Sequence, residues 1–252
     1  MSTLYLVATP IGNLEDITLR ALRILREVPL IAAEDTRQTR KLLQRYEIET
    51  PLVAYHEHNK AHKTANLVEK LAEGDLALVS DAGTPAINDP GWELVQAALH
   101  AGHTVTPIPG PSAPLAALIA SGLPTDAFLY LGYLPRKSSA RRTALQEVRD
   151  LPYTLIFLET PHRLQAALQD LLSELGNRRI AVARELTKVH EEIWRGDLES
   201  ACRHFSETAP RGEFTLVLEG CRTPEAQTWP EERLRTAIAD ARRSGEAPSR
   251  AA

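Results

Sequence analysis

The first half of the chain repeats one pattern five times: a short apolar run, a polar or Gly/Pro-rich junction, and an amphipathic segment. Short apolar runs between turn residues are typical of buried strands, and apolar residues spaced three and four apart are typical of helices that cover a sheet. An alternation of strand and helix predicts a mostly parallel sheet with helices on both faces. The five runs end near Ala8, Ala33, Tyr55, Val79 and Ile108.

The junctions after these runs are the best candidates for a functional cleft, because ligands bind beyond the carboxyl ends of parallel strands. The longest junction, residues 80–91, contains Ala82 and Gly83, whose small size lets a backbone come close to a ligand. We predict that Asp89 caps the next helix and that Pro90 opens it. The junction matches neither G-x-G-x-x-G nor G-x-x-x-x-G-K-[ST]. Taken alone, it is equally well interpreted as an ordinary turn without a ligand.

The second half of the chain has a higher density of strand candidates, which predicts a mixed sheet in a second α/β domain. The candidate strands cover residues 128–133, 153–158, 179–183, 191–195 and 214–218. The predicted organisation is an N-terminal α/β domain over residues 1–122, a C-terminal α/β domain over 123–221 and a partial helical tail over 222–252.

Composition excludes several classes of protein. A formal net charge of −4 rules out a strongly basic nucleic-acid binder, although it leaves room for a local basic face. Two cysteines are too few for a disulfide framework, and we predict no metal site. Because no apolar stretch reaches the length of a membrane span and no signal-peptide pattern precedes the first strand, we expect a cytoplasmic protein.

Seven short motifs lie at the junctions and in the second half. They are TPIGNL (9–14), AEDTR (33–37), HEHN (56–59), SDAGTP (80–85), PGPSA (109–113), TPHR (160–163) and RELTK (184–188). Together, and in this order, they resemble the bacterial ribosomal RNA small-subunit methyltransferase I family of the tetrapyrrole methylase superfamily, the class III S-adenosylmethionine methyltransferases. The resemblance covers residues 4–218.

The resemblance implies a two-domain α/β fold of the tetrapyrrole-methylase type, with S-adenosyl-L-methionine bound in the cleft between the domains, and a homodimer. It also implies methylation of the ribose 2′-hydroxyl of a cytidine in small-subunit (16S) ribosomal RNA, with the free RNA or the 30S particle as substrate. The residues that it assigns to the cofactor are Pro10, Ala82, Gly83, Thr84, Ile87, Ser112 and Ala113, together with Glu159 and Gly212 from the second domain.

The chain departs from the family pattern in three places. Asn88 stands where serine is expected, and Lys60 stands where the family often has glutamate. Family members usually continue past the position of Ala252 into a small helical module, so we expect weak RNA binding if that module contacts RNA.

Methyl transfer from a sulfonium is an in-line displacement, which needs alignment, exclusion of water and removal of the hydroxyl proton. Asp35, His58 and Lys188 are the candidate catalytic residues, and Glu34 is a further candidate proton acceptor, because all four lie at polar junctions.

Residues 136–142 carry four positive charges and no acid, which makes this run the best candidate for contacts with phosphate. A charge run without further evidence is more often a solvated surface. With RNA as the expected partner, the candidate RNA-binding residues are Arg37, His56, Arg136, Lys137, Arg141 and Arg142.

Two other functions stay open from the sequence. The superfamily also contains tetrapyrrole and corrin methyltransferases, although the motifs at 56–59 and 160–163 resemble the RNA branch. A non-catalytic RNA-binding module with a vestigial site is the alternative from a different class.

Overall fold

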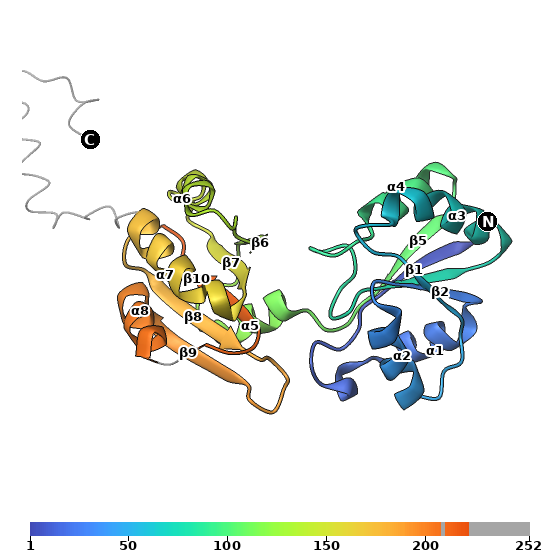
Figure 1. The fold of residues 1–252 in the computed structure, drawn as a ribbon, viewed down its shortest axis with the longest axis horizontal. Helices are drawn as coiled ribbons and strands as arrows, with labels where there is room; N and C mark the ends of the chain where they lie inside the picture. Colours follow the sequence, from blue (N-terminus) through green and yellow to red (C-terminus); the bar gives the residue numbers. More distant parts are fainter. Residues whose placement is uncertain (208–209, 222–252) are drawn as a thin grey trace, which may run out of the picture.

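The computed structural model describes residues 1–207 and 210–221, and the tail predicted over 222–252 lies outside these residues. Two five-stranded sheets, each with its own helices, form two domains side by side (Figure 1). In this described part of the chain, no helix is long and apolar enough to span a bilayer.

The first sheet is entirely parallel, with the strand order β3-β2-β4-β1-β5, which confirms the predicted sheet type. Its elements are β1 (Thr3–Val7), η1 (Leu14–Asp16), α1 (Leu19–Glu27), β2 (Leu30–Ala33), α2 (Thr36–Arg45), β3 (Leu52–Ala54), α3 (Lys60–Glu73), β4 (Leu76–Val79), α4 (Trp92–His100) and β5 (Thr104–Ile108). All four residues of the central strand β4 are buried, as expected for a strand covered on both faces. Helices α1 and α2 pack on one face, and α3 and α4 pack on the other (Figure 1).

Helix α4 begins later than the sequence predicts. Its N-cap residue is Gly91, no side chain caps it, and Asp89 and Pro90 both precede the helix. Ala86 and Asn88 have φ values of 67° and 62°, so the backbone turns through the left-handed region before the helix starts. The prediction that Asp89 is a helix cap is therefore wrong, and its carboxyl group is instead hydrogen-bonded to the side chain of Ser80.

The second sheet is mixed, as predicted, with the order β6-β7-β10-β8-β9. Strands β6 and β7 are parallel, and the other neighbouring pairs are antiparallel. The elements are β6 (Phe128–Tyr133), α6 (Ser138–Glu147), β7 (Thr154–Glu159), α7 (Pro161–Leu175), β8 (Arg179–Arg184), β9 (Glu192–Asp197), α8 (Leu198–Glu207) and β10 (Phe214–Leu218). Helices α6, α7 and α8 cover one face of this sheet with a continuous apolar core.

Helix α5 (Ala113–Ser121) covers the other face of the second sheet. Ala117 and Leu118 are buried there in one cluster with Ile156, Ala181 and Val217. The predicted first domain runs to residue 122 and so includes α5, whereas in the structure α5 packs on the second sheet (Figure 1). An apolar helix of this kind packs equally well on either sheet, so its sequence alone does not choose between them.

Candidate active site

A cavity of about 260 Å³ lies between the carboxyl edge of the first sheet and the inner face of the second. The first domain contributes the junctions after β1, β2, β4 and β5, and the second contributes α5 and strands β6, β7, β8 and β10. The lining residues are Ile11, Glu34, Asp81, Ala82, Thr84, Ile87, Asn88, Asp89, Ser112, Ala113, Pro114, Tyr130, Tyr133, Leu158, Ala183, Leu186, Glu213 and Thr215.

The junction after β4 is held in place by its neighbours in the sheet. Gly83 and Thr9 exchange backbone hydrogen bonds of 2.9 and 3.0 Å, and the Thr84 hydroxyl donates to the Pro111 carbonyl at 3.3 Å. Gly83 has a φ of +79°, and a Cβ there would lie 3.4 Å from the Ile11 side chain. That distance is an ordinary van der Waals contact, so the positive φ is the reason that the turn favours glycine here.

Five of the nine predicted cofactor residues line this cavity: Ala82, Thr84, Ile87, Ser112 and Ala113. Pro10 and Gly83 belong to the framing loops but are not among the lining residues. The structure thus brings the junctions after β4 and β5 together, as the sequence analysis expected.

The two cofactor residues predicted in the second domain have other contacts. The Glu159 side chain is fully buried and pairs with Arg163 at 3.2 Å, while its neighbour Leu158 lines the cavity. Successive side chains of a strand face opposite ways, which directs Glu159 toward α7 rather than toward the cavity. Gly212 has a φ of +89°, and a Cβ there would lie 2.5 Å from the Glu185 carboxyl group.

Three carboxylates of the first domain, Glu34, Asp81 and Asp89, lie on one wall of the cavity. The Asp35 amide donates to Asp81 at 2.9 Å, and the Asp81 amide donates to Glu34 at 3.3 Å, so the junctions after β2 and β4 are tied together. Burial, followed by the charge of Glu34, raises the pKa of Asp89 from its ordinary 3.8 to about 6. Burial also raises the pKa of Glu34, the one candidate proton acceptor of the sequence analysis that lines the cavity.

Two tyrosines of β6 face these carboxylates across the cavity. Tyr130 and Tyr133 are three residues apart, which would place them on opposite faces of a regular strand. The register of β6 against β7 shifts between Tyr130 and Gly132, and this bulge brings both rings to the same side. Burial raises the pKa of Tyr130 to about 12, so its hydroxyl group keeps its proton. A bulge leaves no clear mark in the sequence, which is why these residues were missed.

Two of the predicted catalytic residues are poor proton acceptors. Burial alone would lower the pKa of Lys188, but hydrogen bonds of 2.8 Å to Glu213 and 2.9 Å to Glu185 raise it. A hydrogen bond from the Arg37 side chain lowers the pKa of Asp35 to about 2. Lys188 is therefore fully protonated near neutral pH, and Asp35 is a weak base.

The third predicted catalytic residue, His58, is exposed in the turn after β3 and is not among the lining residues of the cavity. The turn belongs to an edge strand of the first sheet.

The loops of the two domains touch at Gly12. A Cβ on Gly12 would lie 2.4 Å from Cγ of Lys188 and 3.0 Å from the carbonyl oxygen of Leu186, so the loop at 9–14 packs directly against the loop at 185–191. Glu185 and Thr187 in the second loop have φ values of 49° and 66°. The ammonium group of Lys188 neutralises Glu213 and Glu185 and stabilises this strained loop.

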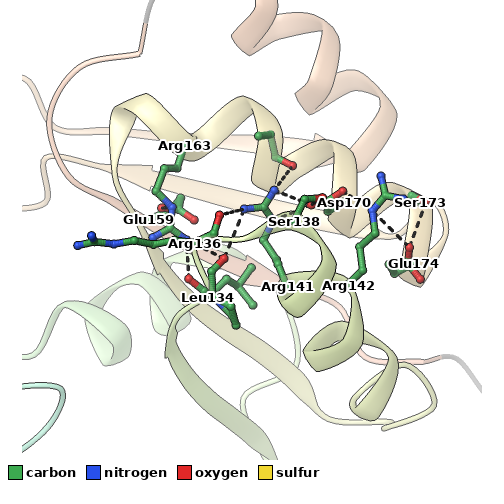
Figure 2. A network of polar contacts seen from close by, with 12 residues as sticks. Leu134, Arg136, Ser138, Arg141, Arg142, Glu159, Arg163, Asp170, Ser173 and Glu174 are labelled. Carbon is green, nitrogen blue, oxygen red and sulfur yellow. Dashed lines mark hydrogen bonds and ion pairs between the residues drawn. The ribbon is translucent and has the colours of Figure 1, made fainter.

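The four basic side chains of the run at 136–142 differ in how deeply they are buried. Arg141 is buried, and its Nε donates to Asp170 at 2.7 Å (Figure 2). Arg142 donates to the other oxygen of Asp170 at 2.8 Å and stays half exposed. The burial of Arg141 contradicts its predicted contact with RNA, because its guanidinium is paired with Asp170 of α7 inside the protein. Arg136 and Lys137 are exposed, and Figure 2 shows Arg136 pointing away from the Asp170 network.

The remaining RNA-binding candidates lie on the first domain. The guanidinium of Arg37 is exposed but engaged by Asp35 at 2.8 Å. His56 is half-buried, its backbone amide donates to Asn59 at 2.9 Å, and its Nε2 lies 3.2 Å from the amide nitrogen of Asn59.

The comparison with known proteins agrees with this two-domain geometry. A family model described as tetrapyrrole (corrin/porphyrin) methylases matches residues 3–202. A Halalkalibacterium halodurans protein named ribosomal RNA small subunit methyltransferase I is 57% identical over 86% of this chain and 76% of its own length. Proteins of the same name from Synechocystis and Bacillus subtilis are 52% and 50% identical, and the matches cover 93% and 89% of this chain and 85% and 77% of theirs.

The chain belongs to the ribosomal RNA small subunit methyltransferase I family of the tetrapyrrole methylases. It is therefore a methyltransferase, and members of this family use a methyl donor of the S-adenosylmethionine type. The solved structure of uroporphyrin-III-C-methyltransferase from Thermus thermophilus has the same fold, with a TM-score of 0.58 and 23% identity over 86% of this chain and 94% of that one.

The cavity of this methylase suits an adenosyl sulfonium. Its first-domain lining includes the small residues Ala82, Ser112 and Ala113, and Ala82 lies next to the turn at Gly83. Apolar side chains of Ile87, Leu158 and Leu186 can cover an adenosyl group, and carboxylates and tyrosine rings suit a cation.

Proposed function

We propose that the cavity binds S-adenosyl-L-methionine and that this methylase transfers a methyl group to the ribose 2′-hydroxyl of a cytidine in small-subunit ribosomal RNA. The observation that carries the proposal is the cavity itself, which is framed by the junction motifs at 9–14, 80–85 and 109–113 and lies between the two domains. The names of relatives about half identical to this chain support ribosomal RNA as the substrate.

In this proposal the small residues of the first domain hold the methyl donor. Ala82, Thr84, Ile87, Ser112 and Ala113 would contact it, and the backbone at Pro10 and Gly83 would shape the surrounding loops. The bound donor supplies a methyl group on a positively charged sulfur. The residues of the chain align the two substrates and exclude water, which are the main requirements of an in-line displacement.

Glu34 is the proton acceptor that we propose for the ribose hydroxyl. It lines the cavity, and burial raises its pKa, which brings it closer to the range that suits general-base catalysis at neutral pH. A contribution of His58 stays a prediction. Replacement of Glu34 by glutamine keeps the shape of the side chain and removes its charge, so we expect a lower single-turnover rate even when the methyl donor is saturating.

We propose that the RNA binds to exposed basic side chains. Arg136 and Lys137 from the second domain are the leading candidates, and Arg37 and the half-buried His56 are the candidates from the first domain. The substrate we propose is the RNA or the 30S particle. We also propose that the protein is a homodimer and acts in the cytoplasm. Light scattering on the purified protein tests the number of subunits.

The decisive experiment maps ribose methylation on 16S ribosomal RNA from a strain that lacks the corresponding enzyme. Addition of this protein and methyl donor should introduce one methyl group at a cytidine, detected as a block to alkaline cleavage at that nucleotide. Methylation of a base, or of a tetrapyrrole instead of RNA, would refute the proposed reaction. Binding of RNA with no transfer to any tested substrate would favour a non-catalytic module.

A further inference from the structure

The cavity of this methylase has a one-sided charge. Its lining contains the carboxylates of Glu34, Asp81, Asp89 and Glu213 and no lysine, arginine or histidine. Glu213 is compensated by Lys188 at 2.8 Å. Within residues 1–207 and 210–221, the other three form no ion pair, although two positive groups lie nearby. The charge of His56 lowers the pKa of Glu34, and the exposed Asp81 is near enough to Arg37 to help raise the pKa of that guanidinium.

The three carboxylates without an ion pair repel one another. The charges of Glu34 and Asp81 both raise the pKa of Asp89, and the charge of Asp81 raises that of Glu34. Like charges held together without a direct ion pair raise the free energy of the unliganded cavity, and a bound cation lowers it. The groups that face Asp89 are therefore Glu34, Asp81, the hydroxyl of Ser80 and, across the cavity, Tyr130 and Tyr133, with Glu213 and Lys188 farther along the same wall.

A metal ion is a poor fit to this wall. In the part of the chain that the structure describes, no group of three or more histidine, cysteine, aspartate or glutamate side chains is arranged to hold one. The rings of Tyr130 and Tyr133 on the opposite wall instead suit a diffuse organic cation, which binds to both carboxylates and aromatic faces.

We propose that Glu34, Asp81 and Asp89 make the cavity selective for the positive charge on the sulfur of the methyl donor, so that the neutral thioether product binds more weakly and leaves. This inference rests on the proposed function, because it concerns the same cavity. Transfer of the methyl group removes one positive charge from the bound molecule and leaves the rest unchanged. The protein thereby loses its attraction for the product at the step that completes the reaction.

Isothermal titration calorimetry with S-adenosylmethionine and S-adenosylhomocysteine tests this inference, since the two ligands differ in the methyl group and one charge. At pH 8 we expect the sulfonium to bind about tenfold more tightly than the thioether. At pH 5 Asp89 takes a proton, and we expect the ratio of the two affinities to fall by about threefold. The ratio is the useful quantity because the amino and carboxyl groups shared by both ligands cancel.

Asp89→Asn keeps the size of the side chain and removes its charge. We expect its affinity ratio at pH 8 to fall by about threefold and to vary less between pH 5 and pH 8 than the wild-type ratio, since the pKa of Glu34 is also raised. Asp81→Asn is the second variant, because an asparagine oxygen can still accept the hydrogen bond from the Asp35 amide. Asp75→Asn is the matched control: it lies before β4, at the opposite end of the strand from the cavity, and should leave the ratio within about twofold of wild type.

Equal affinity of the wild type for both ligands at pH 8 overturns the inference. So does a ratio that neither Asp89→Asn nor Asp81→Asn changes. If both ligands bind equally and RNA is still methylated, the charge inference fails and the proposed function stands. If neither ligand binds, the proposed cofactor site fails together with the inference.

Discussion

Carboxylates in the two domains have opposite surroundings. In the second domain, Asp170 and Arg141 pair with side chains only 5% exposed, and the buried Glu159 pairs with Arg163. On the cavity wall of the first domain, Asp89 and its neighbours Glu34 and Asp81 have no such partner among the described residues. Asp170 accordingly has a lowered pKa, despite burial, because Arg142 and Arg141 hydrogen-bond to it, whereas the pKa of Asp89 is raised.

Carboxylates that stabilise the fold through an ion pair therefore differ from carboxylates that are available to bind a ligand. A paired buried carboxylate is already stabilised by the protein, and its role is to join two helices. A carboxylate with a raised pKa on the wall of a cavity is destabilised in the free protein, which is typical of functional sites. The predictions below test this division, from the largest expected effect to the smallest.

The largest effect should come from breaking the buried pair. Arg141→Met removes the arginine and leaves Asp170 buried, and we expect a loss of about 3 kcal/mol in the free energy of unfolding. The loss is at the lower end for a buried pair because Ser138 and Arg142 still donate to Asp170. Urea denaturation measures it.

Arg142→Met is the matched control, since this arginine contacts the same carboxylate but is half exposed. Its expected cost is about 1 kcal/mol or less. Equal costs for the two variants would contradict the distinction between buried and exposed partners.

Removing the unpaired charge at Asp89 should stabilise the protein. Its pKa of about 6 lies above the ordinary 3.8, so the folded state disfavours the charged form, and the penalty grows as the pH rises from about 4 and is complete above about 6. After a discount for solvent screening of this half-buried group, Asp89→Asn should gain about 1–2 kcal/mol at pH 8 and about half as much at pH 5. A loss of stability at pH 8 would show that Asp89 has a favourable partner in the folded protein.

A smaller effect is expected at the one compensated carboxylate of the cavity wall. Lys188→Met leaves Glu185 and Glu213 without their shared cation, and we expect a loss of about 1 kcal/mol in the free energy of unfolding. Because Glu213 lines the cavity, its uncompensated charge should also make the methyl donor bind slightly more tightly. Thermal unfolding and calorimetry measure the two effects. A large fall in single-turnover rate at unchanged donor affinity would instead support the catalytic role predicted from the sequence.

The smallest expected effect is on the salt dependence of RNA affinity, which should distinguish the exposed Arg136 and Lys137 from the ion-paired Arg142. Neutralising Arg136 and Lys137 together should make the salt dependence of RNA affinity shallower, with the slope of log affinity against log salt changing by about 1.4 for single-stranded RNA. Arg142→Gln should leave the slope unchanged, because Asp170 and Glu174 already compensate this charge. A change in slope for Arg142→Gln would show that its ion pairs open when RNA binds.

Much of the fold could be predicted because it depends on local patterns. The four-residue strand β4 and the amphipathic helices around it follow from apolar spacing, and the parallel order follows from the alternation of strand and helix. The cofactor candidates at Ala82, Thr84 and Ser112 line the cavity because carboxyl ends of parallel strands share one edge. The position of α5 and the start of α4 depend on contacts between segments far apart, and both differed from the prediction.

The sequence by itself determined where strands end and which small, polar junctions follow them, because hydrophobic periodicity and turn chemistry act over a few residues. Only the tertiary structure decided which charges are free. Arg141 and Arg142 look alike in the chain, yet one is buried against Asp170, 29 residues away, and the other is half exposed. Asp89 became a cavity residue because the loop turned it away from α4 and toward Glu34 and Asp81. Ion pairs depend on the distances between charged groups in the folded protein, and a sequence pattern does not give those distances.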